Sequence, residues 1–163
     1  MIAVAEAIRE VLLDAEALDD KPVVPFHFPP LAGPTEEQVA ALQAAMMALP
    51  DRLDVDELTS HHFCEGLYAR ELLIPAGATI VGKRHARQNF FLLVKGEMTV
   101  SSAAGMRRIR APFMCVTQPG DKRVGYAHED SITMNFHANP DDCADLEVLE
   151  QRYITPDLLR YEP

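Results

Sequence analysis

Four side chains that could bind an anion alternate between residues 83 and 89. They are Lys83, His85, Arg87 and Asn89, and they would project from one face if this segment is a regular strand. Lysine and arginine bring positive charge, the arginine fork matches a carboxylate or phosphate, and asparagine adds an amide. The segment therefore predicts a site for a small anionic or polar ligand, such as an organic acid, a sugar phosphate or a nucleotide fragment.

A second candidate strand, 131–137, alternates between apolar and polar residues. Its polar face carries Thr133, Asn135 and His137, and its other face is apolar. The polar face would line either the interior that also holds His85 or the solvent. His137 is therefore a further candidate for ligand binding.

The elements that must position these residues change character near residue 61. From there the apolar period shifts from helical spacing to alternation, and glycine, proline and acidic residues mark turns. About eight short strands at this spacing predict a sandwich or barrel such as a jelly roll. The predicted segments are 61–74, 79–85, 88–95, 97–102, 106–110, 113–117, 123–128 and 131–137.

Helical patterns precede the strand-rich region. Apolar residues at helical spacing indicate a helix in 2–18, and the prolines of 22–34 indicate an extended arm. Thr35 with Gln38 then forms a capping box for a second helix.

A short C-terminal helix is predicted beyond Pro140, with Asp141 or Asp142 as its cap. The expected organisation is a helical extension with a Pro-rich arm, a β-barrel, and a C-terminal helix or tail: 1–60 with the arm 22–34, 61–138 and 139–163.

Composition narrows the class of protein. The chain of 163 residues has a net charge of −10, so nucleic-acid binding is disfavoured because phosphates would repel it. No apolar run approaches the roughly 20 residues of a membrane span.

Cys64, Cys115 and Cys143 form no CxxC pair, which favours reduced thiols and a cytoplasmic location. Basic residues concentrate in 69–128 between acidic flanks, so this centre either binds an anion or is neutralised by the flanks.

The stretch from Gly77 to Gly96 resembles the first motif of the cupin superfamily, whose members are RmlC-like jelly rolls. Gly77 is followed by five residues, Lys83-Arg84-His85, three residues, Asn89, six residues and Gly96. The resemblance covers roughly 62–138. It implies a mainly β fold, the cupin-type double-stranded β-helix, with N-terminal helices and a short C-terminal helix.

The second cupin motif is looser here, with Pro119-Gly120 and, three residues on, Arg123 where the family has a histidine. Family metal sites of this type use three histidines and one glutamate. Of the four matching positions only His85 keeps the family's ligand type, and the others carry positive or amide side chains that would repel or poorly bind a cation. The resemblance therefore implies a degenerate metal site without a cofactor. The predicted ligand-binding residues are Lys83, His85, Asn89, Arg123 and His137.

Several alternatives stay open. Lys83 and Arg123 could pair with Glu71, Glu97, Asp121 or the acidic flanks and close the interior as a structural network. A displaced metal set of His85, His128 and His137 would instead suit a metal-dependent isomerase or oxygenase. Acid–base chemistry by His85 without a metal is also possible, so binding and turnover are not distinguished.

More narrowly, the chain looks like small cupin-like proteins encoded in phages and prophages. With its acidic flanks and the arm 22–34, this suggests an accessory protein that inhibits or modulates a host protein. A homodimer is expected, because the amphipathic N-terminal helix needs cover and barrels of this kind often pair through their strands.

Overall fold

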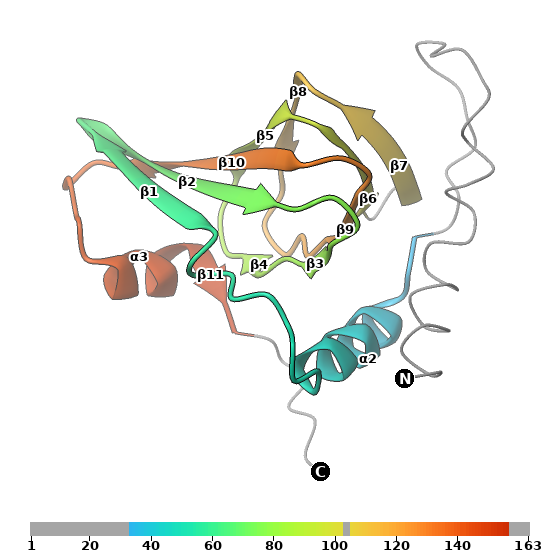
Figure 1. The fold of residues 1–163 in the computed structure, drawn as a ribbon. Helices are drawn as coiled ribbons and strands as arrows, with labels where there is room; N and C mark the ends of the chain where they lie inside the picture. Colours follow the sequence, from blue (N-terminus) through green and yellow to red (C-terminus); the bar gives the residue numbers. More distant parts are fainter. Residues whose placement is uncertain (1–32, 103–104, 157–163) are drawn as a thin grey trace.

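The computed structural model describes residues 33–102 and 105–156, so the predicted helix 2–18 and most of the arm 22–34 lie outside the described residues. Within these ranges the chain folds mainly into antiparallel strands, with the helices α2 (Glu36–Met47) and α3 (Leu146–Tyr153) (Figure 1). Neither of these two helices is long and apolar enough to cross a membrane. The expected mainly β fold class is confirmed.

Two antiparallel sheets form the body of the fold. The larger sheet has five strands in the order β1 (Thr59–Cys64), β2 (Gly66–Ile74), β10 (Ser131–Asn139), β5 (Asn89–Lys95) and β8 (Phe113–Thr117). The smaller sheet has four strands in the order β3 (Thr79–Val81), β9 (Val124–Ala127), β6 (Glu97–Ser102) and β7 (Gly105–Arg110). A two-stranded sheet pairs β11 (Ile154–Thr155) with β4 (Arg84–His85).

Two of the predicted strands are interrupted. Segment 61–74 folds as the hairpin β1–β2, because Gly66 adopts a φ of 73° at the turn. Segment 79–85 divides into β3 and β4, and the chain leaves the strand conformation between His85 and Asn89. The assumption of one regular strand through these two residues is therefore wrong.

Aliphatic side chains fill one end of the space between the two main sheets. Ile74 and Leu93 of the larger sheet meet Met98, Ile109 and Ala127 of the smaller sheet. All five are nearly inaccessible to solvent. Burying a side chain of the size of leucine contributes about 1.5–3 kcal/mol, so this cluster holds the two sheets together.

Towards the other end, the inner face of the larger sheet becomes polar. Thr133 and His137 of β10 are only 4% and 5% exposed. These two residues of the polar face of 131–137 therefore line the interior. The sequence left open whether this face lines the interior or the solvent, and the structure shows the interior. Asn89 of β5 is also buried.

Helix α2 begins as predicted. The Thr35 hydroxyl accepts a hydrogen bond from the Gln38 amide, and the Gln38 side chain accepts one from the Thr35 amide. Val39 and Leu42 of this helix pack against Val124 of β9. The capping box is thus confirmed, and it places an apolar stripe on the smaller sheet.

The cap of α3 differs from the prediction. Asp145 caps this helix by accepting hydrogen bonds from the amides of Glu147 and Val148. The carboxylates of Asp141 and Asp142 bond to other groups instead, so neither is available as the cap.

Gly96 lies where the turn after β5 touches the start of β10. Its φ is 88°, and a Cβ added there would come 2.3 Å from Ser131 Oγ and 2.7 Å from the Asp130 carbonyl oxygen. A side chain at this position would collide with backbone as well as with the serine. The glycine that the cupin-like spacing singles out is therefore required sterically.

Candidate functional site

The interior site is built around two histidines that meet from different parts of the fold. His85 lies on β4 and His137 on β10, and their ring centroids are 5.8 Å apart with planes inclined by 25°. The His137 ring also stacks on Tyr68 of β2 at 5.8 Å and on Tyr153 of α3 at 4.5 Å. An aromatic stack thus joins the larger sheet, β4 and α3.

Helix α3 holds this stack in place. Leu149 and Tyr153 pack with Tyr68 in one buried cluster. The Tyr153 hydroxyl donates to the carbonyl of Ala138, next to His137 in β10. The ring of Tyr153 is therefore fixed against that of His137.

Both histidines keep an unsatisfied ring nitrogen. The Nδ1 atoms of His85 and His137 are buried and have no hydrogen-bond partner among the described residues. Buried polar atoms are nearly always paired, and leaving one unpaired costs about 1–3 kcal/mol. Two such atoms so close together point to a ligand that supplies the partners.

The two rings are uncharged at neutral pH. Burial is the main cause that lowers the pKa of His85 from 6.5 to about 4, and the positive side chains of Arg123 and Arg70 add to it. Burial likewise lowers the pKa of His137 to about 4, followed by the effects of His85 and Arg70. A neutral imidazole has one donor and one acceptor nitrogen, so each ring can donate to an anion or accept from a hydroxyl group.

A buried amide pair lies beside the histidines. Asn89 is 5% exposed, and its Oδ1 accepts a hydrogen bond of 2.8 Å from Nδ2 of Asn135. Its own Nδ2 donates only a long bond of 3.4 Å to the carbonyl of Arg87. Asn89 therefore lies on the inner face as predicted, and its Nδ2 is weakly held.

Arg123 also points into the fold, where it already has partners. Its Nη2 donates to Asp121 Oδ2 at 3.1 Å, and its Nη1 donates to Cys115 Sγ at 3.4 Å. The guanidinium lies 5.6 Å from the ring centroid of Phe91, and its Nε is buried without a partner. The pairing of Arg123 with Asp121 is one that the structural-network alternative foresaw.

Lys83 has a different environment. Its Nζ lies 2.6 Å from Glu150 Oε1 of α3, and the two side chains are 43% and 54% exposed. Arg87 is exposed as well. Of the alternating set, only His85 and Asn89 thus belong to the interior. Lys83 lies between β3 and β4 and Arg87 between β4 and β5, so neither is part of a strand.

The displaced metal set is not assembled. His128 Nε2 bonds to the hydroxyl of Thr99, and the His128 ring packs edge-on against Tyr126. Within 33–102 and 105–156, no three His, Cys, Asp or Glu side chains are grouped so that they could hold a metal ion. Two histidines with an arginine nearby do not fit the divalent cation that the fold family implies.

Sequence reasoning missed Arg70, although it lies on the same inner face. In β2 it alternates with buried Tyr68, and across strands it faces Asn135 of β10 and His61 of β1. Its charge lowers the pKa of both interior histidines. The alternation of β2 alone could have placed Arg70 inside, but its neighbours follow only from the strand register.

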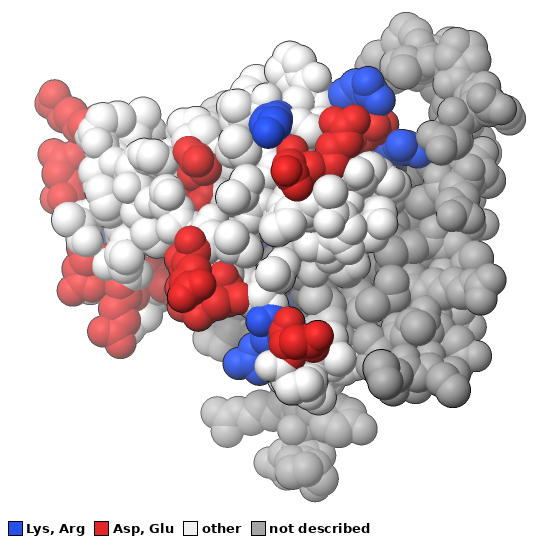
Figure 2. All heavy atoms as spheres, in the orientation of Figure 1, with Lys and Arg blue, Asp and Glu red and all other residues white. Residues whose placement is uncertain are grey.

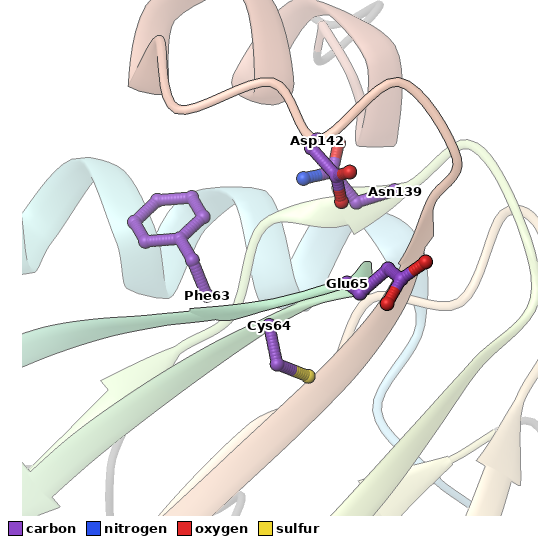
Figure 3. Close-up of a pocket in the computed structure, with 5 residues that line it drawn as sticks. All are labelled: Phe63, Cys64, Glu65, Asn139 and Asp142. Atoms are coloured by element: carbon purple, nitrogen blue, oxygen red, sulfur yellow. The ribbon is translucent and has the colours of Figure 1, made fainter.

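A hollow of about 290 Å³ lies elsewhere, near the β1–β2 turn (Figure 3). Two of its polar side chains already have partners. Asn139 Nδ2 donates to the Cys143 carbonyl, and Asp142 Oδ1 accepts from the Gly66 amide. This hollow is lined by Phe63, Cys64, Glu65, Asn139 and Asp142.

The acidic C-terminal flank is displayed on the surface. Figure 2 shows acidic side chains gathered at the end of the molecule that carries the β1–β2 turn and α3. The exposed acids here include Glu65, Asp141, Asp142, Asp145 and Glu147. These acids form an exposed acidic surface at this end of the molecule.

No family model and no curated protein matches this chain. Among solved structures, an RmlC-like cupin from Shewanella frigidimarina is 15% identical, with 60% of this chain and 96% of that chain covered and a TM-score of 0.39. The Cnp3 cupin domain of Schizosaccharomyces pombe is 18% identical, with 58% and 69% covered and a TM-score of 0.42. Ectoine synthase from P. lautus is 12% identical, with 74% and 92% covered and a TM-score of 0.46.

Three of the solved structures that this chain resembles are named as cupins. At these identities and TM-scores the likeness concerns the fold alone. The narrower resemblance to phage-encoded proteins stays a prediction.

Proposed function

We propose that this protein binds a small anionic or polar ligand in its interior, with His85 and His137 as the central binding residues. Asn89 and Arg123 complete the interior site, and Lys83 contributes from its rim. The observation that carries the proposal is the pair of buried Nδ1 atoms that have no partner within the described chain.

Binding is favoured over acid–base turnover. With a pKa of about 4, His85 is protonated in about one molecule in a thousand at pH 7, so it is a poor general acid. Catalytic groups perform best when their pKa lies near the working pH. A neutral imidazole at this position is better suited to hydrogen bonding than to proton transfer.

A thermal-shift screen of the full chain with phosphate, small carboxylates and sugars tests this function. We expect at least one compound class to raise the unfolding temperature, and His137→Gln to abolish the effect. The exposed His62, substituted in the same way, is the matched control and should respond like the wild type. No stabilisation by any class, or equal stabilisation of His137→Gln, would contradict the proposal. Elemental analysis of protein purified without chelators should find no stoichiometric transition metal.

The expected homodimer has a candidate surface on the outer face of the larger sheet. Two cross-strand rows, Val116–Phe90–Phe136 and Met114–Leu92–Met134, run over β8, β5 and β10. Phe90, Met114 and Val116 are 50%, 61% and 44% exposed. Large contiguous apolar patches on a protein surface commonly mark interaction sites.

A second copy of this chain is the proposed occupant. Two chains of net charge −10 repel one another, so an uncharged apolar surface favours their association by avoiding contact between like charges. These two rows are such a surface, and two sheets can pack face to face about 10 Å apart around a two-fold axis. Light scattering should give twice the chain mass of 18.1 kDa, and a monomeric mass at micromolar concentration would contradict the dimer.

A further inference from the structure

Arg70 is a cation on the inner face whose charge is not neutralised by an ion pair. In β2 it alternates with Tyr68 and Ile74, which are 6% and 1% exposed, so its side chain leaves the sheet on the buried side. The neighbouring Glu71 has the opposite orientation and bonds to His62. Among the described residues, Arg70 makes no hydrogen bond or ion pair.

Its position is central to the interior site. The strand register places Arg70 opposite Asn135, whose amide bonds to Asn89. Its positive charge lowers the pKa of both His85 and His137. The strand register thus places Arg70 on the same face as the site, next to Asn135, which bonds to Asn89.

Among the residues that the structure describes, Arg70 therefore leaves one positive charge of the interior without a counter-charge. Arg123 is neutralised by Asp121 at 3.1 Å, and both histidines are neutral at pH 7. A half-buried guanidinium without a carboxylate is costly, and an anion that supplies one removes this cost.

We propose that Arg70 anchors the ligand of the interior site, and that this ligand is a small monocarboxylate whose carboxylate is its only charge. The planar guanidinium fork matches a carboxylate through two parallel hydrogen bonds. The unpartnered Nδ1 atoms of His85 and His137 then hold the rest of the molecule, with hydroxyl or carbonyl groups as partners. This inference rests on the proposed function and specifies its ligand.

Calorimetric titration of the full chain with monocarboxylates from acetate to benzoate tests it. We expect Arg70→Met to bind the preferred monocarboxylate about 10- to 100-fold more weakly, the loss typical of a charge-assisted bidentate contact. Arg70→Lys should keep part of the affinity, because it retains the charge without the fork. Arg87→Met removes an exposed arginine nearby and should bind like the wild type. The neutral alcohol and the dicarboxylate of matching size should bind more weakly than the monocarboxylate.

Unchanged carboxylate affinity in Arg70→Met, or a preference for the dicarboxylate, would overturn the role of Arg70. If affinity is lost in His137→Gln but kept in Arg70→Met, the interior site stands and only this inference fails. If no compound binds the wild type, both fail.

NMR titration of the histidines tests the position of Arg70 without a ligand. Arg70→Met should raise the pKa of His85 and His137, and an unchanged pKa would place Arg70 away from the site.

Discussion

The imidazoles of His85 and His137 lie 5.8 Å apart and nearly parallel, although one belongs to a two-residue strand and the other to the centre of the larger sheet. Each keeps Nδ1 buried and unpaired within the described part of the chain. This relationship makes the interior site testable without knowing its ligand, because both rings report on their surroundings when they titrate.

The first prediction concerns the stability of the protein at acid pH. Because the folded-state pKa of both histidines is about 4, below the usual 6.5, the unfolded chain takes up protons first. The free energy of unfolding should therefore fall as the pH drops from about 6.5 towards about 4. His137→Gln removes one of these groups, so its unfolding temperature should drop less between pH 7 and pH 5, by about 4–8 °C.

Calorimetry of both proteins across this range makes the comparison. His62→Gln, which changes an exposed ring, should follow the wild type. Parallel curves for His137→Gln and the wild type would mean that His137 is not buried in its neutral form.

The second prediction concerns the buried amide pair. Asn89→Ala leaves the Nδ2 of Asn135 without its acceptor, so it should lower the free energy of unfolding by about 1–3 kcal/mol. Gln88 and Gln118 form a similar amide pair on the surface, and Gln88→Ala should cost less than about 0.5 kcal/mol. Urea denaturation compares the two variants, and equal costs would show that burial does not distinguish the two pairs.

The third prediction is that Lys83 contributes less to stability and to ligand binding than the interior residues do. Its ion pair with Glu150 is exposed on both sides, and such pairs contribute about 0–1 kcal/mol. Lys83→Ala should therefore leave the unfolding temperature nearly unchanged and weaken anion binding less than His137→Gln does. A larger loss of binding in Lys83→Ala would make the rim, rather than the interior, the main contact with the ligand.

The fourth prediction concerns the proposed dimer. Met114→Glu places a carboxylate on the most exposed apolar side chain of the outer face. Two such charges would meet across the two-fold axis, so light scattering should show dissociation into monomers. Met47→Glu is the matched control, because Met47 is also exposed but lies on α2. Dissociation by both variants, or by neither, would contradict an interface on the larger sheet.

Parts of this fold can be predicted from local sequence. The alternation of 131–137 predicts which residues of β10 share a face, although not which face is inward. Thr35 with Gln38 predicts the start of α2, because both signals depend on neighbours within a few residues. The turn at Gly66 was missed, since the alternating pattern continues on both sides of it.

Residues that meet across the fold could not be predicted in this way. Arg70 acquires its place through the register between β2 and β10, and Tyr153 reaches His137 only because α3 packs on Tyr68. Lys83 was assigned to the interior on the assumption of a regular strand. Lys83 instead lies between β3 and β4, outside both strands, so strand alternation does not place it on the face that carries His85.

Gly96 has a consequence for the ligand site that its own position does not suggest. The turn after β5 rests on the backbone at Asp130 and Ser131, a few residues before the point where β10 shifts its pairing with β5. Any larger residue there would push the start of β10 outwards and alter its alignment along the neighbouring strand. Asn135 and His137 would then be carried away from Arg70 and His85, so a mutation far from the ligand would dismantle its binding site.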